Sequence, residues 1–269
     1  MSQDVPPQIA PAPVAPEPQV PETTPKVSRL TRADWVQVGI GFGIGVVFIA
    51  VKGLNWVASY LSILVHETGH WIAGMLFGYP SIPAFDFREG GGFTFHQERS
   101  LFGLFCIYVL ALLPFFWLRR NKLGLAVWGG VVLLFALAAH TRLHDFLILA
   151  AGHGFEVLMA GVFLYRAWAN AAINTPAERP LYAGLGLFMI WHVLAFAWLT
   201  IFDIDRRAWY LQGKLVCAND VVRIQDMTGL SMNTWLWMLM FFAIGTVALS
   251  YLAYRYQNAW RAWVWRAIE

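Results

Sequence analysis

Three ionisable residues stand within five positions of an apolar stretch, SILVHETGHWIAGMLFG, which runs from Ser62 to Gly78. His66, Glu67 and His70 form an HExxH pattern. Residues four apart lie on one face of an α-helix, so both imidazoles can bind one zinc ion and Glu67 can act as general base on a water beside it. A charge inside a membrane costs about 3 kcal/mol or more, which favours a metal site over the alternative, a buried hydrogen-bonded cluster.

The surrounding chain has the composition of a membrane protein. Of its 269 residues, 58% are hydrophobic and 13% are charged, and 14 are Trp. Seven stretches approach the roughly 20 apolar residues that cross a bilayer: 35–51, 53–77, 101–118, 123–139, 146–168, 181–202 and 233–252. We therefore expect an all-α polytopic protein of about seven transmembrane helices in a lipid bilayer. The net charge of +3 is too small to indicate nucleic acid as a partner.

The remaining segments suggest three parts. Residues 1–28 are rich in proline and are predicted to be a disordered tail, 29–252 form the transmembrane metalloprotease-like domain, and 253–269 form an interfacial helix with Trp260, Trp263 and Trp265 among arginines. The loop from Asp203 to Asn233 is expected to be a small extramembrane element with solvated acidic residues. The two cysteines form no pair that indicates a disulfide or a thiolate metal site.

The HExxH stretch and the segment after it resemble a known family. HETGHWIAGMLFG followed by YPSIPAFDFREGGGFT is similar to the site-2 protease family of intramembrane zinc metalloproteases, especially its divergent bacterial branch, in which Gly-Gly-Gly and Thr follow HExGH. The resemblance covers about Leu61 to Phe95. It implies that His66 and His70 bind Zn²⁺, that Glu67 is the catalytic acid and base, that the substrate is a membrane protein, and that the membrane is the bacterial inner (cytoplasmic) membrane.

The third zinc ligand is not evident from a motif. The resembled family uses an Asp of a later span, in a motif of Asn, Pro and Asp-Gly that is missing here. If the spans alternate, the rise of 1.5 Å per residue puts His66, His70, His153, Glu156 and His192 all roughly 10 to 16 Å from one membrane face. Because the family uses a carboxylate, Glu156 is the leading third ligand and His153 the next, the other supporting a ligand by hydrogen bonding. His192 is expected to be an interhelical hydrogen-bonding residue, with a ligand role left open.

The segment from Tyr79 to Gln97 predicts a β-hairpin. FDFREGGGFTF alternates apolar and polar residues around glycines. By resemblance, this segment lies beside the zinc, with Gly91, Gly92 and Thr94 as substrate-binding residues, and an exposed edge could pair with an unwound substrate. An ordinary extramembrane loop is the alternative. His96 is expected to be a solvated loop histidine, and His140, His144 and Asp145 an interfacial cluster.

Three functions stay open at this stage. The leading hypothesis is an intramembrane zinc metalloprotease. The second is a catalytically inactive scaffold or pseudoprotease, because the Asp motif is missing. The third is a di-iron oxygenase or desaturase, since His66 with His70 and His140 with His144 form two HxxxH pairs, although the chain has only seven histidines and no HxxHH cluster. The oligomeric state is left open.

Overall fold

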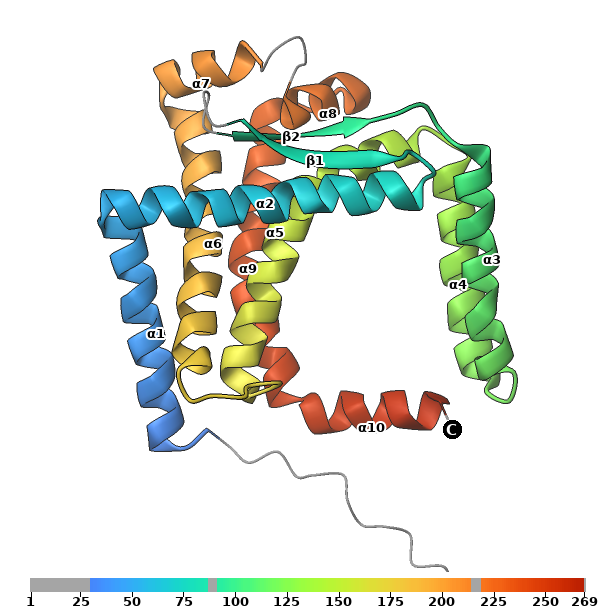
Figure 1. Ribbon diagram of the computed structural model, residues 1–269, viewed down its shortest axis with the longest axis horizontal. Helices are drawn as coiled ribbons and strands as arrows, with labels where there is room; N and C mark the ends of the chain where they lie inside the picture. The colour runs from blue at the N-terminus through green and yellow to red at the C-terminus, as the bar shows by residue number, and fades with distance from the viewer. Residues whose placement is uncertain (1–29, 87–90, 214–218, 269) are drawn as a thin grey trace, which may run out of the picture.

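The computed structural model describes residues 30–86, 91–213 and 219–268. In this part the chain forms helices and one small sheet (Figure 1). The elements are α1 (Arg32–Ala50), α2 (Lys52–Leu76), β1 (Ser81–Asp86), β2 (Gly91–His96), α3 (Leu101–Leu118), α4 (Lys122–Ala139), α5 (Leu143–Ala169), α6 (Glu178–Phe202), α7 (Ile204–Leu211), α8 (Asp220–Thr228), α9 (Met232–Arg255) and α10 (Gln257–Ile268). The predicted tail, residues 1–28, lies outside the described residues.

Six of the described helices are long and apolar enough to cross a membrane: α1, α3, α4, α5, α6 and α9. They coincide with six of the seven predicted spans. Many of their large apolar side chains are exposed, including Phe105 and Phe241, as expected for helices surrounded by lipid. The chain is an integral membrane protein with a mostly helical, polytopic fold.

The core of the bundle lies where α1, α5, α6 and α9 meet. Its buried members include Val38, Leu164, Met189 and Ala243. At one end of this core, Arg179 of α6 is only 2% exposed. It forms an ion pair with Asp34 of α1 and donates hydrogen bonds to the carbonyl oxygens of Ala167 and Trp168 on α5. Since a buried charge must be paired, this arginine ties three helices together.

Helix α2, which contains the HExxH pattern, runs across the bundle rather than along it (Figure 1). Helix α1 ends at Ala50. The next residue, Val51, has an extended backbone (φ −89°, ψ 107°), and α2 starts after it in a new direction. The predicted span over 53–77 is not among the six helices suited to cross a membrane. The comparison of depths assumed that this helix crosses the membrane, whereas α2 runs across the bundle. The residues that it placed at one depth, His66, His153, Glu156 and His192, do meet.

The predicted β-hairpin is confirmed. Strands β1 and β2 pair antiparallel with Ser81 opposite His96 and Asp86 opposite Gly91. Both strands contact α2, and they lie on the side of α2 away from α10 (Figure 1). The residues at the tip of the hairpin, 87–90, lie outside the described residues.

The predicted extramembrane element between α6 and α9 contains two short polar helices, α7 and α8. They are anchored by a small apolar cluster in which Tyr210 and Val221 pack against Met232 and Leu236 of α9. Asn219 contributes by donating a side-chain hydrogen bond to the carbonyl oxygen of Tyr210. These contacts fix the start of α8 over the bundle, where α8 packs against α5.

The C-terminal helix α10 leaves α9 at Tyr256 and lies across the end of the bundle opposite to the hairpin (Figure 1). Its bounds agree with the predicted helix in residues 253–269, although α9 itself continues to Arg255.

Candidate metal centre

The two histidines of the HExxH pattern meet an aspartate from a distant part of the chain. Nε2 of His66 lies 3.0 Å from Nε2 of His70. Oδ2 of Asp220 lies 3.2 Å from the first nitrogen and 3.0 Å from the second. Four ligands placed tetrahedrally about Zn²⁺ at roughly 2.0–2.1 Å stand about 3.3 Å from one another. The three atoms therefore have close to the spacing of three ligands of one metal ion.

Asp220 is the first residue of α8, and it corrects an expectation from the sequence. The acidic residues of the loop from Asp203 to Asn233 were expected to be solvated, but the side chain of Asp220 is only 26% exposed and points at both histidines. Burial raises the pKa of its carboxyl, whereas His70 and His66 lower it by more, so its pKa lies well below the usual range. Asp220 is thus a carboxylate, the form that binds a metal.

The centre lies where α2 and α5 approach each other closely. A Cβ atom at Gly152 of α5 would overlap Nε2 of both His70 and His66, so any larger residue would fill the space beside the donor atoms. A Cβ atom at Gly69 of α2 would likewise overlap the carbonyl oxygen of Ala151. The donor set of two imidazoles and one carboxylate fits a zinc ion.

The second ring nitrogen of each histidine is also engaged. Nδ1 of His70 lies 2.7 Å from the carbonyl oxygen of Ile148, which can only accept, so Nδ1 carries the proton. Nδ1 of His66 lies 3.2 Å from Oε2 of Glu156. In the neutral imidazoles that bind a metal, these contacts put the proton on Nδ1 and leave the Nε2 lone pair facing Asp220, the arrangement of carboxylate–histidine–zinc sites.

Glu156 is the centre of a buried hydrogen-bond network. It is 2% exposed. Its Oε1 accepts hydrogen bonds from Ser62 Oγ at 2.5 Å and from His192 Nδ1 at 3.1 Å. Its Oε2 accepts from Nδ1 of His66 at 3.2 Å and from Nδ1 of His153 at 3.0 Å. An ionised carboxylate has four acceptor sites, and four neighbours occupy them.

The two predicted candidates for the third ligand, Glu156 and His153, both belong to this network. His66, His153 and Glu156 do form a second group that could hold a metal. However, they meet at Nδ1 of His66, on the opposite side of the ring from Nε2, which faces His70 and Asp220. One imidazole binds two metals only after losing both protons, so with both histidines on one ion Asp220 completes the set and Glu156 supports His66. His192 has the interhelical hydrogen bond that was expected.

The candidate base, Glu67, is held by the hairpin. Glu67 is 6% exposed, and Oγ1 of Thr94 lies 2.8 Å from its Oε2. The backbone of β2 passes so close that a Cβ atom at Gly92 would lie 2.5 Å from Cγ of Glu67. Gly91 starts β2, opposite Asp86. The predicted substrate-binding residues Gly91, Gly92 and Thr94 thus belong to the strand that covers Glu67.

The other histidines have different neighbours. His96 lies in β2 rather than in a solvated loop. Since Oγ of Ser81 donates to the carbonyl oxygen of Tyr79 at 2.6 Å, it accepts from Nδ1 of His96 at 2.7 Å. His140 and His144 contact the hydroxyls of Tyr108 and Tyr79. Neither belongs to a potential metal group in the part of the chain that the structure describes.

Asp220 is the candidate metal ligand that the sequence did not reveal. It is separated from His70 by 150 positions, and it stands in a polar segment without the Asn, Pro and Asp-Gly motif. A weak local signal is present, because Asn219 can cap a helix and DVVRIQDM places Val221 and Ile224 on one apolar face. This pattern predicts a docked helix that starts at Asp220, but not what lies beneath it.

Comparison with protein-family models, with curated proteins and with solved structures finds no match to this chain.

Proposed function

We propose that the protein is an intramembrane zinc metalloprotease that hydrolyses peptide bonds in or near the membrane segments of other proteins. The observation that carries the proposal is the convergence of His66, His70 and Asp220 next to Glu67. Two imidazoles and a carboxylate are the donor set of a hydrolytic zinc site with one position left for water or substrate. Glu67 adds a separate base, and all four residues belong to a membrane protein.

The resemblance to site-2 proteases supports the same function. That family completes its HExxH site with an aspartate from a later part of the chain, and Asp220 supplies an aspartate here although its sequence motif is absent. The hypothesis of an inactive scaffold depended on the lack of a third ligand, so Asp220 weakens it. The di-iron hypothesis needs His140 and His144 as ligands, and both have tyrosine partners instead.

In the proposed mechanism, each residue of the site has its own role. His66, His70 and Asp220 would hold the metal, which when bound lowers the pKa of a water and polarises the scissile carbonyl. Glu67 takes the proton of the attacking water and returns it to the leaving amine. Thr94 holds the Glu67 carboxylate in place with its hydroxyl. Glu156 keeps His66 oriented through its Nδ1 atom.

The proposal also assigns roles to β2 and α10 and names the membrane. β2 would guide an extended substrate past Glu67, because its second edge is not paired with any strand in the described residues. The helix α10 would lie at the membrane interface, where its tryptophans and arginines suit the boundary between lipid and water. By resemblance, the membrane is the bacterial inner membrane.

Two measurements test the proposal. Elemental analysis of the purified chain is expected to give about one zinc per chain, and His66→Ala and Asp220→Ala should each remove it. Co-expression with tagged single-span membrane proteins should give cleavage with the wild type and none with Glu67→Gln. Two irons per chain would favour the oxygenase, and zinc binding without cleavage of any client would favour the scaffold.

A further inference from the structure

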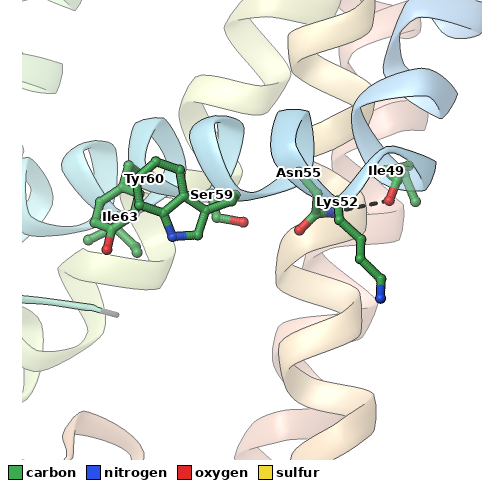
Figure 2. Close-up of a pocket in the computed structure, with 7 residues that line it drawn as sticks. Ile49, Lys52, Asn55, Ser59, Tyr60 and Ile63 are labelled. Carbon is green, nitrogen blue, oxygen red and sulfur yellow. Dashed lines mark hydrogen bonds between the residues drawn. The ribbon is translucent and has the colours of Figure 1, made fainter. Parts of the chain in front are cut away.

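A pocket of about 470 Å³ lies along the first half of α2, next to the corner between α1 and α2. Figure 2 labels six of its lining residues, which come from the end of α1 and the first half of α2: Ile49, Lys52, Asn55, Ser59, Tyr60 and Ile63. Trp56 also lines it, and its ring contacts that of Tyr60 at 4.9 Å between centroids. The pocket therefore combines an ammonium group at one end with aromatic and apolar side chains along its length.

The pocket leads toward the metal centre. Lys52, Ser59 and His66 are spaced by seven residues, and a spacing of seven deviates by only about 20° from a straight line along a helix. Ser59 thus lies about 20° and Lys52 about 40° around the helix from His66, on the same side of α2. At about 1.5 Å per residue, Lys52 stands roughly 21 Å from His66 along α2.

The hairpin joins the inner end of the pocket to the base. A Cβ atom at Gly92 would lie 2.8 Å from Cγ2 of Ile63 and 2.5 Å from Cγ of Glu67, so these two side chains lie side by side beneath β2. Phe85 of β1 contacts the ring of Tyr60 at 5.9 Å. The strands that cover Glu67 therefore also cover the inner end of the pocket, while its outer end, at Lys52, is open.

Lys52 has no ion pair with any residue in the described ranges, and its side chain is exposed. The other lining residues add no second charge, since they are two aromatic, two aliphatic and two uncharged polar side chains. A positive charge at the outer end of an otherwise neutral pocket is complementary to a carboxylate.

We propose that this pocket holds the substrate chain on one side of the scissile bond, and that Lys52 selects substrates with an acidic residue about six positions from that bond. The proposal rests on the proposed function and specifies its substrate. An extended chain rises about 3.3 Å per residue, so roughly 21 Å corresponds to about six residues. The intervening residues pass Ile63, Tyr60 and Trp56 and are preferably apolar or aromatic, whereas Ser59 offers a hydroxyl to the backbone.

Peptide hydroxamates test this arrangement, because the hydroxamate binds the zinc ion and fixes the register of the attached peptide. Two sets of seven-residue apolar peptides would be used, one with the hydroxamate at the amino end and one with it at the carboxyl end. Residues are counted from the hydroxamate in both sets. Each set contains peptides with Glu at the sixth residue, with Gln at the sixth residue and with Glu at the third. Affinity for the zinc-loaded full chain in uncharged detergent is measured in the Glu67→Gln variant, which leaves the peptides intact.

In one of the two sets, Glu at the sixth residue should bind about two- to fivefold more tightly than Gln, the range of an exposed ion pair. Glu at the third residue should give no gain. Lys52→Glu should abolish or reverse the preference, whereas Lys122→Glu, which changes the first residue of α4 far from the pocket, should leave it intact. Trp56→Ala should weaken all long peptides and spare a one-residue hydroxamate.

The outcomes separate the two proposals. If the one-residue hydroxamate binds but Glu at the sixth residue gains nothing in either set, the selection by Lys52 is overturned and the metalloprotease proposal stands. If the preference survives Lys52→Glu, the pocket is not the binding site. If no hydroxamate binds to the zinc-loaded chain at all, the zinc ion is not open to a substrate group and both proposals fall.

Discussion

Asp220 and His70 are 150 positions apart in the sequence, yet Oδ2 of the aspartate lies 3.0 Å from Nε2 of the histidine. Between them the chain forms most of the membrane bundle, α3 to α6. The aspartate reaches the site because Val221 and Tyr210 anchor the start of α8 in an apolar cluster. The candidate metal centre thus depends on the docking of a short polar helix onto α5 and α9.

The first prediction concerns this aspartate. Asp220→Asn should lower zinc affinity by about 100-fold or more, because loss of a direct ligand should cost at least as much as loss of a supporting hydrogen bond. Competition with a chelator measures the affinity. Asp226→Asn is the matched control, since Asp226 lies on the same helix α8 but is exposed. Equal affinities of the two variants would remove Asp220 from the ligand set.

The space beside the donor atoms gives a second prediction. Gly152→Ala should abolish zinc binding, because the added methyl group overlaps Nε2 of His66 and His70, and it should destabilise the fold by about 1–3 kcal/mol. Gly154→Ala lies two residues away on α5 with nothing within 4 Å of the added atom. It should keep zinc and raise helix stability by up to about 1 kcal/mol. Zinc content and thermal unfolding would be measured for both, and a zinc-loaded Gly152→Ala protein would contradict the assignment.

A third prediction separates the base from the metal ligands. Glu67→Gln should reduce hydrolysis by about 10²- to 10⁴-fold while zinc content stays near one per chain. Thr94→Val should reduce it by roughly 10- to 100-fold, because a hydrogen bond to a charged group is lost, and Thr94→Ser should retain most activity. Parallel assays of cleavage and zinc content test this. Thr94→Val that is as active as Thr94→Ser would show that the hydroxyl is dispensable.

A fourth prediction concerns Glu156. Glu156→Gln replaces one of two acceptor oxygens by an NH₂ donor, so one imidazole must change its tautomer and the orientation of His66 is lost. Zinc affinity should fall by about 10- to 100-fold. Glu178→Gln makes the same change at the start of α6, where the carboxylate only accepts from Thr175 and Asn174, and zinc affinity should not change. An unaffected Glu156→Gln variant would leave the network without a role in metal binding.

Local patterns in the sequence predicted the parts of the site that are close in the chain. His66 and His70 share a helix face because of their spacing, and the hairpin follows from alternation around glycines. The spans follow from apolar length. These features depend on residues within one element, and the structure confirms that HExxH lies on a helix and that β1 pairs with β2.

The parts that the sequence did not reveal depend on how elements pack. The length of α2 suited a membrane span, but the extended residue Val51 turns it across the bundle. Glu156 has the burial and chemistry of a ligand, and only the orientation of the His66 ring shows that it contacts Nδ1 and not Nε2. In the sequence, Asp220 resembles an ordinary loop carboxylate, because only the packing of α8 brings it to the two histidines.

The contact of Gly69 with Ala151, one residue before Gly152, has a consequence for how such a protein can diverge. The candidate metal centre is shaped by two backbones in contact, and not by a particular set of large side chains. Lipid-facing positions on α3, α4 and α9 can therefore drift freely among apolar residues over evolutionary time. Any descendant that keeps this metal centre must inherit minimal side chains at positions 69 and 152.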